Sequence, residues 1–229
     1  MTRVWPLAPI LLVQGVWVAA RATRLPEAEG PRAGVAGAGP DLRLLILGDS
    51  SAAGVGVARQ EAALAGQVVA DLARSHRVSW RLVAKSGATA RSAQALLQST
   101  PAGTFSHALV ALGVNDTKNF VPLPRFEAAY AATLDQLSTR FGVRHVVLSG
   151  VPPMGLLPIL PRPLRDVLGA RAARFDTVIR ALAAARGGQH LPMDFTEDIS
   201  QMAEDGLHPG PDIYAAWAAR AAALLRETA

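Results

Sequence analysis

Residues 43–54 have the sequence RLLILGDSSAAG, and this stretch decides the fold. A short apolar run that ends at a glycine, here 44–47 before Gly48, predicts a buried strand of a parallel sheet. Asp49 and Ser50 then lie where the strand stops. Open α/β sheets bind their ligands at the carboxyl ends of their strands, so Ser50 is a candidate nucleophile.

Two other roles for this turn stay open at this point. Asp49 and Ser50 would also suit the cap of the following helix, since strand-to-helix turns commonly end on Asp or Ser. A phosphate-binding loop is disfavoured, because the G-x-x-x-x-G-K-[ST] pattern needs a lysine after the glycines. The chain's only lysines are Lys85 and Lys118.

The composition is that of one globular domain with an appendage. The chain has 229 residues, half of them apolar, a formal net charge of +5 and no cysteine. The absence of cysteine excludes disulfides, thiolate zinc sites and a cysteine nucleophile. A basic surface favours anionic membranes or acidic substrates. Aromatic residues are few and no basic patch is interleaved with them, so we expect no nucleic-acid partner.

The N-terminal segment, residues 1–22, has a signal-like layout. An apolar stretch over 4–20 follows Arg3, and Ala20-Arg21-Ala22 resembles a small-residue cleavage site. We expect either a cleaved signal, an uncleaved membrane anchor, a peripheral amphipathic segment or a helix packed on the domain. The protein is accordingly expected to be exported (periplasmic or secreted) or membrane-associated. Residues 23–40, rich in Gly, Pro and Ala, are predicted to be a linker before a domain over 41–229.

Apolar runs and helix-length segments alternate through the rest of the chain, which predicts an α/β fold with a parallel sheet. The strand candidates are 44–47, 80–84, 108–112, 146–148 and 190–193. The helix candidates are 61–74, 90–98, 124–141, 164–186 and 213–226.

A serine hydroxyl needs a base to become a good nucleophile, and histidine is the usual base near neutral pH. Of the five histidines, only His208 has an acid, Asp205, placed three residues earlier in a tight loop. Asp205 would fix the tautomer of His208 and stabilise the imidazolium that forms. His107 and His145 are expected at the starts of strands, on the opposite rim of the sheet.

Acyl transfer also needs hydrogen-bond donors for the oxyanion. Three groups at predicted strand ends supply them: the backbone N–H of Ser50, the backbone N–H of Gly87 and the side-chain amide of Asn115. Each of these residues has an ordinary role in a turn when taken alone. Their occurrence together at one rim favours a catalytic site.

The sequence resembles the SGNH (GDSL) hydrolases over residues 41–228, in four blocks that follow the family's order: Gly48-Asp49-Ser50, Gly87, Gly113-x-Asn115-Asp116 and Asp205-x-x-His208. The resemblance implies a flavodoxin-like three-layer α/β/α sandwich with a five-stranded parallel sheet. It also implies Ser50 as nucleophile, Asp205 and His208 as its partners, oxyanion donors at Ser50, Gly87 and Asn115, and no metal or cofactor. The second block departs from many relatives, which have an Asn shortly before the glycine.

We expect a serine hydrolase that cleaves acyl esters of lipid-like or lysophospholipid type, or thioesters, through an acyl-enzyme intermediate. The apolar, Pro-rich segment 151–164 would hold an acyl chain or, equally, pack as a loop on the sheet edge. The alternatives are a carbohydrate O-deacetylase, an acyltransferase on the same fold, and a non-catalytic, membrane-tethered binding protein. Membrane association, if present, is expected through residues 4–20, and the sequence does not predict the oligomeric state.

Overall fold

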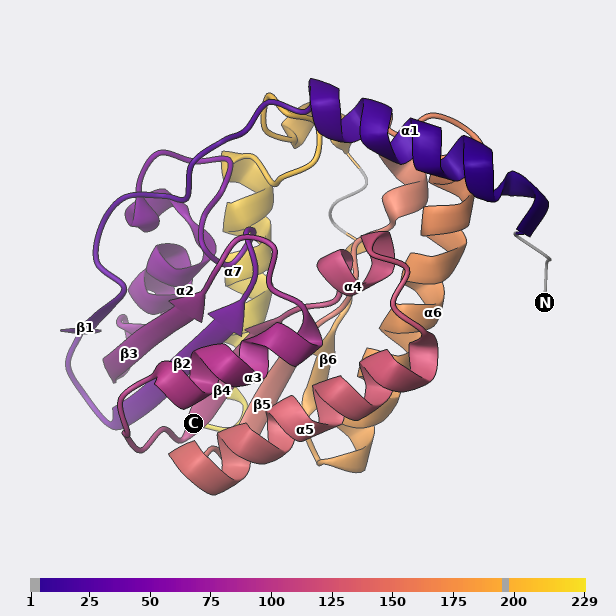
Figure 1. Ribbon diagram of the computed structural model, residues 1–229. Helices are drawn as coiled ribbons and strands as arrows, with labels where there is room; N and C mark the ends of the chain where they lie inside the picture. Colours follow the sequence, from indigo (N-terminus) through magenta and orange to yellow (C-terminus); the bar gives the residue numbers. More distant parts are fainter. Residues whose placement is uncertain (1–4, 195–197) are drawn as a thin grey trace.

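The apolar runs of the sequence form one central sheet with helices on both of its faces (Figure 1). The structure is a computed structural model, and it describes residues 5–194 and 198–229. Within these residues the sheet has six strands in the order β1-β3-β2-β4-β5-β6. The strands are β1 (Ala33–Ala36), β2 (Asp41–Gly48), β3 (Arg77–Ala84), β4 (His107–Ala111), β5 (His145–Ser149) and β6 (Gln189–Leu191).

The predicted fold class is confirmed: strands β2 to β6 are parallel, as five strands of a three-layer sandwich should be. The sheet has one strand more than predicted. β1 lies inside the stretch 23–40 that was predicted to be a linker, and it pairs antiparallel with β3. Its sequence, AGVA, carries no alternating apolar pattern because an edge strand buries little, and Val35 is exposed.

The helices and short 3-10 turns complete the two outer layers. They are η1 (Trp5–Leu7), α1 (Ala8–Arg21), η2 (Gln60–Ala62), α2 (Leu64–Leu72), α3 (Ala90–Ser99), α4 (Val114–Lys118), α5 (Leu123–Phe141), η3 (Met154–Leu156), α6 (Leu164–Ala185), η5 (Ile199–Gln201) and α7 (Pro211–Arg226). Each predicted helix is present with its ends shifted by at most a few residues. The short helix α4 was predicted as a turn.

Alternate residues of β2 serve the two cores, which explains why its apolar run is continuous. Leu45 and Leu47 pack with residues of α3, α5 and α6 on one face of the sheet. Leu44 and Ile46 pack with residues of α2 and α7 on the other. Figure 1 shows the two layers, with α3 and α5 in front of the strands and α7 behind them.

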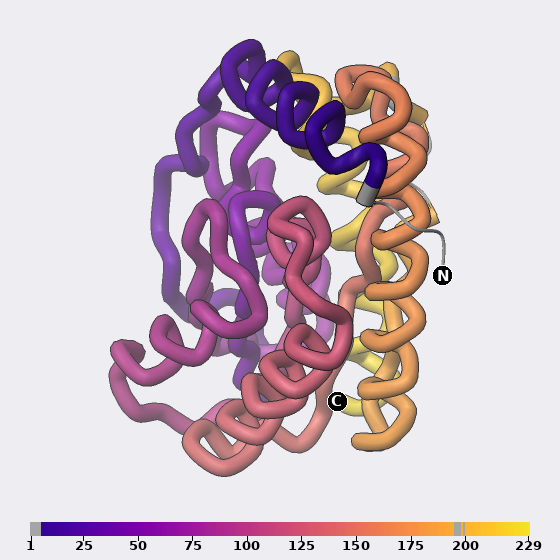
Figure 2. The backbone as a smooth tube through the Cα atoms, turned by 45° about the vertical axis from the view of Figure 1, so that its right-hand side comes forward, coloured from indigo at the N-terminus to yellow at the C-terminus, as the bar shows by residue number. Residues whose placement is uncertain are grey.

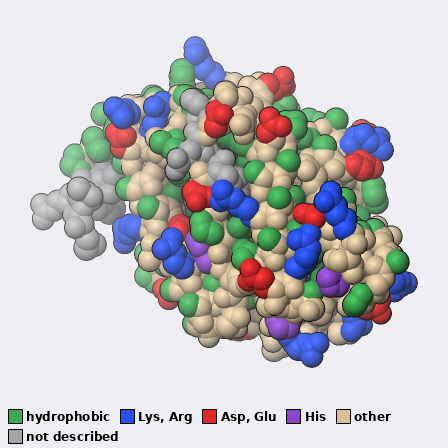
Figure 3. Space-filling view, turned by 180° about the vertical axis from the view of Figure 1, so that it is seen from behind, with side chains coloured by type: hydrophobic (Ala, Val, Ile, Leu, Met, Phe, Trp, Pro, Cys, Tyr) green, Lys and Arg blue, Asp and Glu red, His purple; other side chains and the backbone are tan. Residues whose placement is uncertain are grey.

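The face seen from behind carries basic side chains interspersed with acidic ones, not a single basic patch (Figure 3). One ion pair joins the two helices of that layer, Arg226 of α7 to Asp71 of α2 at 2.5 Å. The net positive charge is therefore partly spent in local pairs on this side of the molecule.

Helix α1 lies across the end of the molecule, beside α6 and far from the sheet's β1 edge (Figure 2). Of the alternatives for the N-terminal segment, the structure shows a helix packed on the domain, with Leu11 and Val18 buried. Gln14 fixes the helix through two hydrogen bonds: its Nε2 donates to the Arg162 carbonyl at 2.6 Å, and its Oε1 accepts from the Leu164 N–H at 3.0 Å. Among the helices of the described residues, none has the length and apolar character that a bilayer span requires.

Candidate active site

Ser50 stands directly after β2, on a turn that only small residues permit. A Cβ on Gly48 would lie 2.3 Å from the Cβ of Ala52 and 2.8 Å from the Ala111 carbonyl oxygen. The turn is closed by backbone bonds from Ala53 N–H to the Asp49 carbonyl and from Val55 N–H to the Ser50 carbonyl. Glycine at position 48 therefore lets the chain turn sharply enough to present Ser50 at the end of the sheet.

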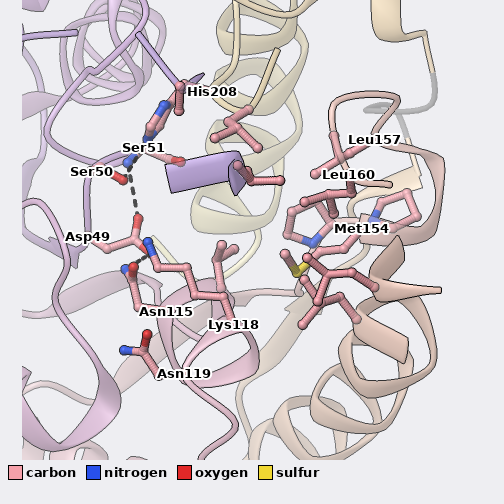
Figure 4. A pocket seen from close by; sticks show the side chains of 18 of the residues that line it. Asp49, Ser50, Ser51, Asn115, Lys118, Asn119, Met154, Leu157, Leu160 and His208 are labelled. Atoms are coloured by element: carbon pink, nitrogen blue, oxygen red, sulfur yellow. Dashed lines mark hydrogen bonds between the residues drawn. The ribbon is translucent and has the colours of Figure 1, made fainter. Parts of the chain in front are cut away.

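The structure brings together the three residues that the sequence predicted as a triad. His208 Nε2 lies 2.9 Å from Ser50 Oγ, and His208 Nδ1 lies 2.5 Å from Asp205 Oδ2. Figure 4 shows His208 directed toward Ser50. The loop of His208 approaches the turn closely at Gly56, where a Cβ would lie 2.2 Å from the Pro209 carbonyl oxygen.

Asp205 is held by its own loop before it meets the imidazole. Its Oδ1 accepts hydrogen bonds from the backbone N–H groups of Leu207 at 2.9 Å and His208 at 3.0 Å. Burial alone would raise the pKa of this carboxyl, but these bonds and that from the His208 side chain lower its pKa below the ordinary value. Asp205 is therefore ionised at neutral pH and faces Nδ1, which keeps the proton of the neutral imidazole on that nitrogen and leaves Nε2 free to accept one from Ser50.

A buried polar network joins three of the strand ends. Asp49 accepts from the Ser51 N–H at 3.1 Å and from Asn115 Nδ2 at 3.0 Å. Asn115 Nδ2 also donates to the Ala88 carbonyl at 2.9 Å, and Asp116 accepts from the Ala90 N–H at 3.0 Å. Burial raises the pKa of both Asp49 and Asp116 to about 6. These two carboxylates thus position the turns, as the sequence suggested.

We expect the raised pKa of Asp49 to appear as a pH dependence of stability. Between its ordinary value of 3.8 and about 6, the folded carboxyl keeps a proton that the unfolded chain has released. The free energy of unfolding should therefore fall by about 3 kcal/mol through this group as the pH rises from about 4 to above 6, at about 1.4 kcal/mol per pKa unit.

Denaturant unfolding of the wild type and Asp49→Asn at several pH values measures this contribution. The difference in stability between the two should move in favour of Asp49→Asn as the pH rises through this window. Asp41→Asn, at an exposed carboxylate, is the control. Parallel stability curves for wild type and Asp49→Asn would contradict the assignment.

The three predicted oxyanion donors differ in their surroundings. Within the described residues, the backbone N–H groups of Ser50 and Gly87 make no hydrogen bond. Both hydrogens of the Asn115 amide are engaged, one by Asp49 and one by Ala88. Ser50, Asn115 and His208 line one cavity, whereas Gly87 is exposed and is not among the described residues that line it.

The loop of Gly87 is held by a residue that sequence reasoning missed. The carboxylate of Glu27 accepts from both the N–H and the Oγ of Ser86, each at 2.7 Å. It also pairs with Arg32 at 2.5 Å. Glu27 lies in the stretch predicted to be a linker and 59 residues from Ser86. No local pattern in the sequence signals a contact over that separation.

A second acid–histidine pair also went unpredicted. His190 Nε2 lies 2.9 Å from Asp176 Oδ1, which also accepts from the Val151 N–H at 3.2 Å. The sequence offered no acidic neighbour for His190 because Asp176 comes from α6 and His190 from β6. This pair fixes the chain after β5 and makes no contact with Ser50.

A family model described as the GDSL-like lipase/acylhydrolase family matches residues 46–216. The chain belongs to this family. The resemblance on which the sequence analysis relied is thereby confirmed.

Similar proteins include a curated GDSL-like esterase, Rv1075c of Mycobacterium tuberculosis, which is 28% identical over 157 residues, or 67% of this chain. The chain spans about half the length of that relative, at 49%.

Solved structures of similar fold share 18–20% identity with the chain. The psychrotrophic esterase EstA from Pseudoalteromonas has a TM-score of 0.59, with 81% of this chain and 97% of that chain covered. TesA has a TM-score of 0.64 with 82% and 99% covered. A catalytic mutant of Axe2, an acetylxylan esterase from Geobacillus stearothermophilus, has a TM-score of 0.57 with 83% and 95% covered. At these identities the likeness supports the fold.

Beside the polar cluster of this GDSL-like protein lies a large apolar cavity of about 990 Å³. Figure 4 shows Ser50, His208, Asp49 and Asn115 at one side, and the apolar side chains of segment 151–164 at the other. The apolar walls come from three places, namely α1 (Leu11, Leu12, Val16, Val18), the segment after β5 (Met154, Leu157, Leu160, Leu164, Leu168) and the C-terminal part (Met193, Met202, Leu207, Trp217). The contribution of α1 was not predicted.

Proposed function

We propose that this protein is a serine hydrolase that cleaves carboxylic acyl esters. The observation that carries the proposal is the chain of contacts from Ser50 Oγ through the His208 imidazole to Asp205, at 2.9 Å and 2.5 Å. A non-catalytic binding protein would not require this set of residues in this order. Membership of the GDSL-like lipase/acylhydrolase family supports the same chemistry.

In the proposed reaction, Ser50 Oγ attacks the ester carbonyl carbon while its proton passes to His208 Nε2. Asp205, ionised and buried, stabilises the resulting imidazolium. The C–O bond to the alcohol then breaks, and the alcohol leaves with the proton from Nε2. Water attacks the acyl-enzyme with His208 again as the base, which releases the acid and restores Ser50.

The walls of the cavity favour an ester with an apolar acyl part, of lipid-like or lysophospholipid type or the corresponding thioester. An acetyl group would leave most of a cavity of about 990 Å³ unused, so a sugar O-deacetylase fits less well. An acyltransferase would share the acyl-enzyme and differ only in the acceptor. Adding a primary alcohol to the assay and measuring ester product against free acid separates transfer from hydrolysis.

Labelling with a fluorophosphonate probe tests the nucleophile directly. The wild type and Ser51→Ala should label, since Ser51 contributes its backbone to the turn, and Ser50→Ala should not. Equal labelling of wild type and Ser50→Ala would overturn the assignment. A p-nitrophenyl ester series of rising chain length, hydrolysed by the wild type and not by Ser50→Ala, then defines the acyl preference.

The Asn115 amide is proposed as an oxyanion donor that leaves one of its two acceptors when substrate binds. Asn115→Ala is then expected to lower kcat by about 10²- to 10³-fold, the loss typical of one donor. Asn119→Ala is a matched control, because Asn119 lines the same cavity but is exposed, and its loss should be small. Thermal unfolding of both variants separates a catalytic loss from loosening of the contacts with Asp49 and Ala88. A kcat within fivefold of wild type in Asn115→Ala would remove it from the oxyanion site.

We also propose that the outward face of α1 rests on an anionic lipid surface. This face exposes five large apolar side chains, Ile10, Leu12, Val13, Val16 and Trp17. Arg21 stacks on the Trp17 ring at 4.5 Å, and Arg24 follows, so apolar and basic groups occur together as interfacial helices require. Export of the protein and cleavage of residues 1–22 stay predictions.

Co-sedimentation with phosphatidylglycerol vesicles tests the surface. Val13→Glu should bind several-fold less than the wild type, because it places a carboxylate on the apolar face. Val35→Glu, at a similarly exposed valine on β1, should bind as the wild type does. Equal binding by all three proteins would exclude this face as the contact.

A further inference from the structure

Helix α1 covers the cavity with one continuous face. The cavity is lined along α1 at helical spacing by Ala8, Leu11, Gly15, Val18 and Ala22. The family match begins at residue 46, so this roof lies outside the part of the chain that the family model covers. The fold of the family therefore does not account for it, and its contribution must be argued from its own contacts.

The roof is joined to the opposite wall of the same cavity. Gln14 donates to the Arg162 carbonyl and accepts from the N–H of Leu164, the first residue of α6. That N–H is one of the helix-end donors that lack a partner within the helix, and Gln14 supplies one. Leu160 and Leu164, on either side of this contact, line the cavity. The helix and the wall are thus held at a fixed separation, with the cavity between them.

Gly15 occupies the middle of the roof and is poorly suited to a helix for its own sake. Glycine inside a helix costs about 0.5–1 kcal/mol relative to alanine. No close approach of another backbone requires it, since a Cβ at this position would meet nothing within 4 Å. Gly15 borders the cavity, so what the missing side chain leaves is space beneath α1.

We propose that α1 roofs a binding site for a single unbranched acyl chain, and that Gly15 sets the length of chain the site accepts. The inference rests on the proposed ester hydrolase, and it names the substrate as an ester of a medium or long fatty acid. The carbonyl lies at Ser50 and the chain runs between α1 and the wall that includes Met154, Leu157 and Leu160. A cavity of about 990 Å³ lies at the upper end of the range for small-molecule sites, about 300–1,000 Å³.

The test compares two leucine substitutions on the same helix of the full chain. Gly15→Leu places a side chain in the cavity, whereas Ala20→Leu adds the same group at an exposed position that does not line it. With p-nitrophenyl esters from acetate to palmitate, Gly15→Leu should lower the ratio of kcat/KM for dodecanoate to that for acetate at least tenfold. Ala20→Leu should keep the wild-type ratio. An unchanged ratio in Gly15→Leu would overturn the inference.

Two further measurements keep the inference distinguishable from the proposed function. In the Ser50→Ala background, the fluorescent fatty acid cis-parinaric acid should bind, and adding Gly15→Leu should raise its Kd at least tenfold. If the wild type hydrolyses no ester but this binding difference holds, the proposed function fails and the chain site stands. If cis-parinaric acid binds Ser50→Ala and its Gly15→Leu variant equally, the chain site fails. Gly15→Ala, with one added methyl group, should give an intermediate shift and replaces Gly15→Leu if that variant does not fold.

Discussion

Replacement of His208 by alanine is expected to lower kcat for a p-nitrophenyl ester by about 10⁴- to 10⁶-fold, as removal of a triad base does elsewhere. His208 is within 2.9 Å of the Ser50 hydroxyl, and no other described histidine contacts that serine. Without the imidazole, the proton of Ser50 has no acceptor and the alcohol that leaves has no donor. Single-turnover and steady-state rates on the same ester measure the loss.

His76→Ala is the matched control for this experiment. His76 lies in the turn before β3, at the opposite end of the sheet, and contacts Ser75. It should keep kcat within about twofold of the wild type. A loss of less than about 100-fold in His208→Ala, with the variant folded, would mean that another group acts as the base.

The second large effect is expected for Asp205→Asn, with kcat lowered by about 10⁴-fold and the fold retained. The asparagine oxygen would stay with the backbone N–H groups of Leu207 and His208, which Asp205 Oδ1 now accepts. Its NH₂ group would then face His208 Nδ1 and donate to it. The imidazole would carry its proton on Nε2, where it cannot accept the proton of Ser50.

Asp212→Asn controls for removal of a nearby charge, since Asp212 is exposed in the first turn of α7. It should retain wild-type activity. The tautomer itself can be followed by the ¹⁵N shifts of His208, which should move its proton from Nδ1 to Nε2 in Asp205→Asn. Activity of Asp205→Asn within tenfold of the wild type would show that another group orients His208.

The sequence allowed prediction of what depends on short stretches. A continuous apolar run ending at Gly48 predicts a strand buried on both faces, and β2 is such a strand. The tight spacing of Asp205 and His208 predicts a local pair, and the pair is present at 2.5 Å. Since parallel strands end at one rim, Ser50 could be expected to meet that pair although it lies 158 residues away.

The features that escaped prediction have no local signal. β1 consists of small residues on an edge, and Glu27 meets Ser86 only after the chain has folded. Helix α1 is apolar on all sides, so its periodicity does not say which face is buried. Of the predicted oxyanion donors, Gly87 has a free N–H but lies outside the cavity lining, a position that depends on how its loop folds.

The hydrogen bonds from Glu27 to Ser86 bear on where this protein can be cut. A fragment designed from the family match would start near residue 46 and would keep every residue of the proposed triad. It would lose Glu27, which holds the loop before Gly87, the strand that closes the free edge of β3, and the roof of the cavity. Such a fragment would expose the apolar wall of the cavity and the backbone of β3 to solvent, both of which promote aggregation. For expression and crystallisation, the useful N-terminal boundary therefore lies before α1.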